Sequence, residues 1–170
     1  NIRPLIDEIV TAMAGRTFEI IYIDDASTDA TAEELSDSQR AFPQLRVLRH
    51  AKRAGQSAAL RSGLLAANGY LIAVLDGDGQ NVPSDFPALE AALLADYPER
   101  GMAAGIRQKR KDTAVKLLAS RIAKWIRKAL LGDTHPDSGC GIKILHRDLF
   151  IELPFFNHMH RFMPSLVRRH

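Results

Sequence analysis

The sequence is poor in cysteine and in aromatic residues, and it has no long hydrophobic run. Its single cysteine, Cys140, excludes an internal disulfide and a cysteine-rich zinc site. Aromatic residues make up only 6% of the chain and are not interleaved with basic ones, which makes a nucleic-acid binder the least favoured class. The longest uncharged stretch, residues 62–75, is too short to cross a bilayer. The early charges Arg3, Asp7 and Glu8 do not fit a signal peptide.

What remains is the composition of an ordinary globular protein, with 46% hydrophobic and 25% charged residues. We expect a single domain over residues 1–170. Its net charge of +3 is unevenly distributed, because residues 107–128 hold nine Lys or Arg and one acid, Asp112. This segregation indicates an anionic partner, such as phosphate groups, a membrane surface or nucleic acid. A solvated helix face explains it equally well.

Short apolar runs alternate with helical patterns along the chain. The runs predict strands at residues 18–23, 45–49, 70–75, 102–106 and 142–145. The patterns predict helices at residues 2–13, 55–67, 87–95 and 113–131, and another from the capping residues 27–29 to about residue 40. Residues 147–153 are expected to form a short helix or a turn. This alternation predicts an α/β fold, with a Rossmann-like, mostly parallel sheet and helices on both faces. Such a sheet binds its ligand beyond the carboxyl ends of its strands.

Two acidic clusters follow predicted strands. Asp24 and Asp25 come after the run at 18–23, and the segment 76–80 (Asp-Gly-Asp-Gly-Gln) comes after the run at 70–75. The fold rule puts both clusters at one edge of the sheet. Two carboxylates one residue apart form a compact set of hard oxygen ligands, suited to Mg²⁺ or Mn²⁺ shared with substrate phosphates. The intervening glycines permit positive φ and close approach of a ligand.

Segment 76–80 has several interpretations. A calcium-binding EF-hand loop is excluded, because Asn81 stands where that loop needs glycine and Pro87 where it needs glutamate. A haloacid-dehalogenase-like phosphatase has a similar Asp-x-Asp-Gly start, but with threonine where Gln80 stands. A receiver domain would leave Asp78 unexplained. A simple Asp-Gly turn explains one of the two pairs and not the whole segment. The remaining interpretation is a nucleotide-sugar transferase.

Motifs in four places resemble those of family-2 glycosyltransferases with the GT-A fold. Residues 23–31 (IDDASTDAT) resemble the VDDGSTDGT segment of that family, and residues 76–80 its Asp-x-Asp metal motif. The latter is similar to the form found in the polyprenyl-phosphate branch, which includes dolichyl-phosphate mannose synthases. Residues 53–63 resemble the glycine-containing loop and helix, and residues 137–143 (DSGCGIK) the acceptor-side loop. The likeness covers nearly the whole chain.

The chain departs from the family pattern at several points. The family opens with a strand similar to VVVPVYNE, whereas this chain opens in a helical pattern, and it closes without a finished element. We therefore expect that both ends of the domain are truncated. Ala26 stands where the family has glycine, and Asp137 directly precedes Ser-Gly instead of standing three residues before it.

The resemblance implies a role for each site residue, and simpler roles stay open for some of them. The residues implied in donor binding are Asp24, Asp25, Gly55, Asp76 and Asp78. Those implied in metal binding are Asp76, Asp78 and Gln80; in phosphate binding, Arg107 and Arg121; and in catalysis near the acceptor, Asp137. Asp24 and Asp25 could instead cap a helix, and Gly55 could be an ordinary turn glycine. His158, His160 and Arg161 are either acceptor contacts or surface residues.

The resemblance implies an inverting, metal-dependent glycosyltransferase that moves a sugar from a UDP- or GDP-sugar to a polyprenyl phosphate, using Mg²⁺ or Mn²⁺. This activity would serve cell-envelope glycans at the cytoplasmic face of the membrane, with the protein peripheral to that surface and monomeric or homo-oligomeric. The alternatives are a non-catalytic nucleotide- or phosphate-binding module of the same fold, and the phosphatase. The sequence indicates neither a His/Cys zinc cluster nor a Ser-His-Asp arrangement.

Overall fold

The fold is that of a computed structural model, which describes residues 1–95, 101–106, 137 and 139–169. The first half contains α1 (Ile2–Ala12), β1 (Ile20–Asp24), α2 (Thr31–Ala41), β2 (Leu45–Arg49), α3 (Gln56–Ala66) and β3 (Leu71–Val74). The second half contains η1 (Pro83–Asp85), α4 (Phe86–Ala95), β4 (Met102–Ala104), β5 (Lys143–His146), α6 (Arg147–Glu152), η2 (Met159–Arg161) and α7 (Met163–Arg169). Each predicted element in the described part is present, with its ends within about two residues. The predicted helix at 113–131 lies outside the described residues.

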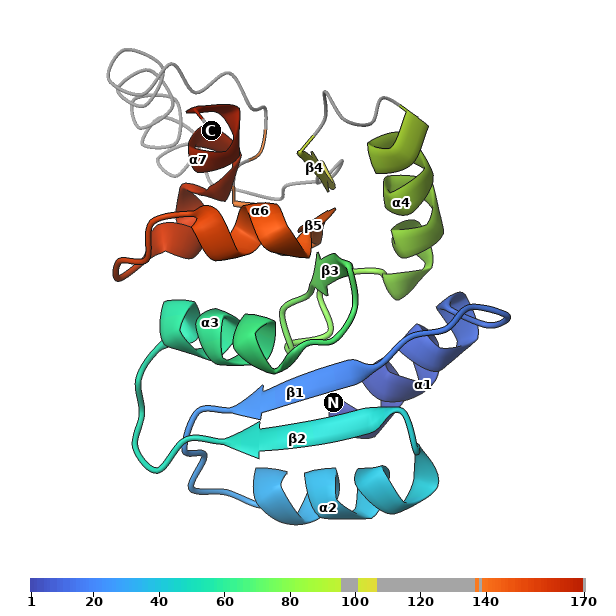
Figure 1. Ribbon diagram of the computed structural model, residues 1–170. Coiled ribbons are helices and arrows are strands. Elements are labelled where there is room, and N and C mark those ends of the chain that lie inside the picture. The colour runs from blue at the N-terminus through green and yellow to red at the C-terminus, as the bar shows by residue number, and fades with distance from the viewer. Residues whose placement is uncertain (96–100, 107–136, 138, 170) are drawn as a thin grey trace, which may run out of the picture.

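Strands β1 and β2 form a parallel pair, in register from Ile20 opposite Leu45 to Asp24 opposite Arg49. Figure 1 shows α2 along the lower side of this pair and α3 above it. The apolar stripe of α1 and the start of both strands bury a common core, made of Ile2, Ile6, Ile20, Leu35 and Leu45. This core holds the pair so that both strands end, at Asp24 and Arg49, near the start of α3.

A second sheet has the strand order β3-β5-β4, and β5 is antiparallel to both neighbours. Strands β3 and β4, which are connected through α4, therefore run in the same direction, as the strand–helix alternation predicts. Only β5, inserted between them, runs the other way. The α/β class is confirmed, and β5 is the strand of the described residues whose pairings are antiparallel. Apolar runs identify strands without fixing the direction from which a distant strand enters the sheet.

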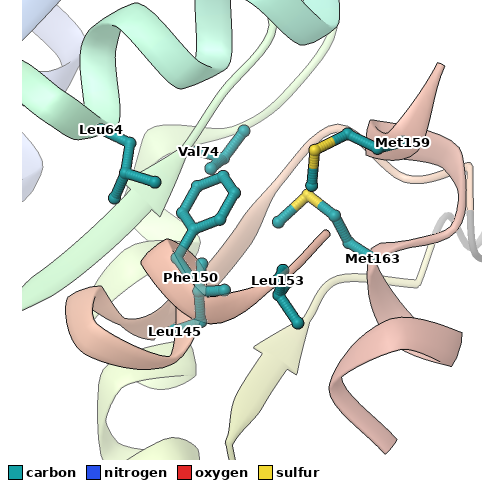
Figure 2. Close-up of a cluster of buried hydrophobic side chains, with 7 residues drawn as sticks. All are labelled: Leu64, Val74, Leu145, Phe150, Leu153, Met159 and Met163. Atoms are coloured by element: carbon teal, nitrogen blue, oxygen red, sulfur yellow. The ribbon is translucent and has the colours of Figure 1, made fainter. Parts of the chain in front are cut away.

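The second sheet is held by the largest apolar cluster, in which side chains from six segments meet (Figure 2). These are Leu64, Val74, Leu145, Phe150, Leu153, Met159 and Met163. The cluster joins α3, β3 and β5 to α6, η2 and α7, so it places the C-terminal residues of η2 beside the end of β3. Burying each of these side chains stabilises the fold by roughly 1.5–3 kcal/mol, so η2 is firmly held.

The two sheets are separated by a cavity of about 770 Å³, lined along its length by β1 and β3. Leu5, Ile9 and Met13 of the α1 region and Gly63 of α3 complete its wall. In the part of the chain that the structure describes, β1 pairs only with β2, and β3 only with β5. Each of these two strands thus has an edge without a strand partner. No helix among the described residues has the length and hydropathy needed to span a membrane.

Candidate functional site

The two consecutive aspartates at the end of β1 have different environments. Asp24 is only 2% exposed, and its Oδ1 accepts a hydrogen bond of 2.9 Å from the Ser27 backbone N–H. Its Oδ2 lies 3.2 Å from Arg49 Nε, in an ion pair without hydrogen-bond geometry. The side chain of Asp25 is 23% exposed and points to the loop before α3. Asp24 therefore stabilises the turn, and of the pair Asp25 is the accessible carboxylate.

Asp25 organises the loop that leads into α3. It accepts backbone hydrogen bonds from Ala54 (2.8 Å) and Gly55 (2.7 Å), and its Oδ1 lies 2.7 Å from His50 Nδ1. The hydrogen bonds from His50 and then Ala54 lower the pKa of Asp25 below its usual range, so this carboxylate is ionised at neutral pH. Gly55 has φ +88°, a conformation that favours glycine and that lets the loop wrap the carboxylate.

Gln56, the first residue of α3, connects the two acidic clusters. Its side-chain Nε2 donates a hydrogen bond of 2.7 Å to Asp76 Oδ1, while the preceding N–H of Gly55 binds Asp25. On the other side, a side chain at Gly77 would come within 3.1 Å of Tyr22 Oη, so β1 also packs closely on the second acidic segment. The expected convergence of the two clusters is thus observed, with the start of α3 between them.

The acidic segment after β3 forms an exposed turn. Asp78 Oδ1 accepts a hydrogen bond of 3.0 Å from the Gln80 backbone N–H, and Gly79 has φ +74°. Asp78 and Gln80 are exposed to solvent, whereas Asp76 is half-buried. No group of three His, Cys, Asp or Glu side chains forms a closed metal site within the described residues. Two carboxylates on a turn fit a Mg²⁺ or Mn²⁺ ion that takes its other ligands from water and substrate phosphates.

A smaller pocket of about 240 Å³ lies beside Asp76. Its wall includes Gly141, Lys143, His160 and Arg161, together with Asp76 itself. A Cβ at position 141 would overlap the Asp76 carboxylate, so glycine there lets the two segments lie against each other. The predicted acceptor-side loop, residues 137–143, therefore meets the predicted metal-binding segment.

Two polar side chains of this pocket, Lys143 and His160, are held by specific contacts. Lys143 is only 5% exposed, and its Nζ donates to the backbone oxygen of Cys140. His160 Nδ1 lies 2.9 Å from Ser57 Oγ of α3. Burial, followed by the positive charge of Arg161, lowers the pKa of His160, so this histidine is neutral at neutral pH. Because His160 is neutral, the positively charged side chains that line this pocket with Asp76 are Lys143 and Arg161.

Of the remaining predicted site residues, Asp137 lies in the described part of the chain. Asp137 is 7% exposed, and its backbone oxygen accepts a hydrogen bond of 3.2 Å from the Cys140 N–H. Cys140 itself is buried, as expected for a packing residue. Arg107 and Arg121, like the rest of the basic segment, lie outside the described residues.

Sequence reasoning missed three polar residues of this site: His50, Gln56 and Lys143. A usable signal existed for His50, because it directly follows β2 and so stands at the same strand edge as the aspartates. Gln56 and Lys143 stood within segments that resemble family motifs, but nothing in their spacing marked them. Their roles depend on which carboxylate or carbonyl lies opposite, which only the fold defines.

Ala26 has φ +60°, the left-handed conformation that costs an L-residue about 1–2 kcal/mol. We expect Ala26→Gly to raise the free energy of unfolding by about 0.5–1 kcal/mol, because glycine removes this strain at some cost in chain entropy. Thermal unfolding should show a rise in Tm of about 1–4 °C. Ala59→Gly, inside α3, is the matched control and should lower Tm, since φ is helical there. A fall in Tm for both variants contradicts the strain at Ala26.

The chain is similar to known sugar transferases over most of its length. The family model described as Glycosyl transferase family 2 matches residues 1–153. Dodecaprenyl-phosphate galacturonate synthase of Rhizobium johnstonii is 33% identical over 175 residues, which cover 98% of this chain and 50% of the relative. Undecaprenyl-phosphate 4-deoxy-4-formamido-L-arabinose transferase of an Enterobacter species is 29% identical over 156 residues, which cover 91% and 47%. The chain spans about half the length of these curated relatives.

Solved structures of glucosyl-3-phosphoglycerate synthase from Mycobacterium tuberculosis have the same fold. The complex of that enzyme with uridine diphosphate is 25% identical, with a TM-score of 0.69 over 91% of this chain and 55% of that chain. Its complex with Mn²⁺, UDP-glucose and phosphoglyceric acid, at 24% identity, has a TM-score of 0.69 over 91% and 54%. The fold, the meeting of the two acidic segments and the match over residues 1–153 agree, and the chain belongs to glycosyl transferase family 2, with an α/β fold of the GT-A type.

Proposed function

We propose that this domain transfers a sugar from a UDP- or GDP-sugar to a polyprenyl phosphate. The observation that carries this proposal is the link through Gly55 and Gln56, which bind Asp25 and Asp76 from neighbouring positions. A nucleoside diphosphate needs a hydrogen-bond acceptor for its base or ribose, and a site for its charged diphosphate. The two acidic clusters supply both requirements within one site.

In this proposal Asp25 contacts the base or ribose of the donor, and Gly55 lets the loop approach the nucleotide. Asp24, which is buried, supports the turn after β1 instead of contacting the donor directly. Asp76 and Asp78, with Gln80, face the diphosphate end. This division follows from exposure, since Asp78 is open to solvent and Asp25 retains an accessible carboxylate.

Asp76 and Asp78 would hold Mg²⁺ or Mn²⁺, because their oxygens are the ligands such ions prefer. When bound, the ion neutralises charge on the departing nucleoside diphosphate. Gln56 orients Asp76 through its hydrogen bond, and Gly141 leaves room for that carboxylate. The Asp76 carboxylate is thereby oriented before the ion binds, whereas Asp78, on its exposed turn, can adjust its orientation.

The pocket beside Asp76 would receive the phosphate of the acceptor. Lys143 and Arg161 provide positive charge there, and Arg107 and Arg121 would add to it as the resemblance implies. A lipid phosphate is already an anionic nucleophile, so no general base is required, and Asp137 would position the acceptor loop. Displacement at the anomeric carbon with inversion is what the family resemblance implies.

We propose further that the protein acts peripherally at the cytoplasmic face of a membrane. The names of both curated relatives specify a polyprenyl phosphate, a lipid that resides in membranes. The nine Lys or Arg of residues 107–128 suit an anionic surface, each contributing about 1 kcal/mol of attraction near it.

We also propose that the cavity between β1 and β3 accepts one extended apolar strand, the one with which the family pattern opens. Both flanking strands have an edge without a strand partner in the described part of the chain. The cavity is lined along its length by these strands and by apolar side chains of α1. Ile2 of α1 packs in one apolar cluster with Ile20 of β1, so a segment that precedes α1 would start close to this strand. Such a strand would join the two sheets into one catalytic domain.

Calorimetric titration with UDP and with GDP, each with and without MnCl₂, tests the donor site. We expect one of the two nucleotides to bind at micromolar concentrations and to require the metal. Release of nucleoside diphosphate on addition of a polyprenyl phosphate, measured with the full-length protein, tests transfer. Binding without release would favour the non-catalytic module, and failure to bind either nucleotide would contradict the donor site. Membership of glycosyl transferase family 2 argues against the phosphatase.

A further inference from the structure

We propose that His50 is a positioning residue that fixes the Asp25 carboxylate for the donor nucleotide, through a hydrogen-bonded chain from Ser62 to His50 to Asp25. This inference rests on the proposed donor site. No Ser-His-Asp arrangement could be predicted from the sequence, because the three residues come from different segments. Asp25 follows β1, His50 follows β2 and Ser62 lies in α3.

The imidazole of His50 is held at both nitrogens. Nδ1 lies 2.7 Å from Asp25 Oδ1, and Nε2 lies 2.9 Å from Ser62 Oγ. The backbone N–H of His50 also donates a hydrogen bond of 2.9 Å to the backbone oxygen of Asp24. Since an ionised carboxylate only accepts, Nδ1 donates to Asp25, while Ser62 Oγ holds Nε2. The position of the ring is therefore defined by residues on both sides.

Counted over the residues that the structure describes, the contacts at Asp25 use three of its lone-pair directions. A carboxylate has about four lone-pair directions. His50 and Ala54 occupy Oδ1, and Gly55 occupies Oδ2. The remaining lone pair of Oδ2 can accept a hydrogen bond, but this oxygen cannot donate one. The matching ligand group is thus an N–H or O–H donor, such as the ring N–H of a uracil or guanine base or a ribose hydroxyl.

The same three residue types form the nucleophilic triad of many hydrolases, but this arrangement lacks the rest of that machinery. Ser62 lies in the interior of α3, where backbone N–H groups are engaged in the helix and cannot form an oxyanion hole. The carboxylate end lies at the loop that starts α3, where Gly55 and Gln56 bring it to the second acidic cluster. The chain of hydrogen bonds therefore serves Asp25 and does not activate Ser62.

A double-mutant cycle tests this inference, with the Kd of UDP and GDP in MnCl₂ as the readout. We expect His50→Ala to weaken binding of the preferred nucleotide about tenfold, because a hydrogen bond to a charged group is lost and the carboxylate can rotate. Ser62→Ala should weaken nucleotide binding about twofold to threefold, since it removes only the contact at Nε2 of His50, the ring nitrogen that does not face Asp25. His50→Ala should have no further effect in the Asp25→Ala background, because its influence passes through the Asp25 carboxylate.

Two further measurements separate positioning from a purely structural role. In NMR spectra of the free protein, the His50 ring should carry a hydrogen-bonded proton on Nδ1, and Asp25→Ala, which removes the acceptor, should abolish that signature. His50→Gln, which can still donate to Asp25, should recover part of the affinity that His50→Ala loses. The control Thr11→Ala removes an exposed hydroxyl of α1, and it should change neither the nucleotide Kd nor the His50 spectrum.

Three outcomes would overturn the inference. A lowered Tm for His50→Ala with unchanged nucleotide affinity would mean that His50 only clamps the loop. An equal loss of affinity in the wild-type and Asp25→Ala backgrounds would mean that His50 acts independently of Asp25. If the wild-type protein binds neither nucleotide, the proposed donor site has failed and the positioning role falls with it, even if NMR shows the hydrogen-bonded proton on Nδ1.

Discussion

Replacing Asp78 by alanine should lower the Mn²⁺-dependent affinity for the preferred nucleoside diphosphate about 100-fold. Asp78 is an exposed carboxylate on a turn, so its principal interaction in the free protein is the hydrogen bond from the Gln80 N–H. Removing a charged ligand from a divalent ion costs several kcal/mol of charge stabilisation. Turnover of the full-length protein should fall at least as far, because the same ion would neutralise the leaving group.

The controls separate metal binding from stability of the turn. Asp78→Asn keeps an acceptor for the Gln80 N–H but loses the charge, so it should impair binding about as much as Asp78→Ala. Asp37→Ala removes an exposed carboxylate on α2 and should leave nucleotide affinity unchanged. Calorimetry with and without MnCl₂ measures both effects. If Asp78→Ala binds the nucleotide as tightly as the wild type in Mn²⁺, the proposed metal site is wrong.

Supplying a strand for the cavity between β1 and β3 should stabilise the domain strongly. The change is a six-residue run of valine and isoleucine, joined to Asn1 by a short linker. Each buried side chain contributes about 1.5–3 kcal/mol, and each residue costs about 1–2 kcal/mol to order. Hydrogen bonds to the two free edges add to the gain. We expect a net increase in the free energy of unfolding of about 2–4 kcal/mol and a Tm higher by about 5–15 °C.

The matched control is a fusion of the same length made of glycine and serine, which can enter the cavity without filling it. It should leave Tm within about 2 °C of the unfused chain, since it buries little apolar surface. Hydrogen exchange should also show new protection of β1 and β3 amides in the valine–isoleucine fusion alone. Equal Tm values for the two fusions would show that the cavity does not accept a strand.

Much of the fold could be predicted because its signals are local. The run at residues 45–49 predicted β2 with its observed ends, and the apolar stripe at 2–13 predicted α1 within one residue. The direction of β5 could not be predicted, because it depends on how a distant segment returns to the sheet. For the same reason, the sequence could not predict that β1 and β3 belong to different sheets. Their apolar runs indicate strands without indicating which neighbours they pair with.

The candidate site divides in the same way. The strand-end rule identified Asp25, Asp76 and Asp78, and the segment around residue 140 was found by its resemblance to a family motif. His50 was missed although it also stands at a strand end. Its role depends on Ser62 and Asp25, which approach it only when α3 packs over β1 and β2.

The amino-acid sequence alone determined the class of fold, the family and the carboxylates around which the site is built. These follow from apolar periodicity and from short motifs, in which the residue types required lie within a few positions of one another. Tertiary structure decided which aspartate of the first pair is buried, that Gln56 joins the two clusters, and that His50 fixes Asp25. Each of these depends on contacts between segments far apart in the chain, and such contacts exist only once the elements have packed.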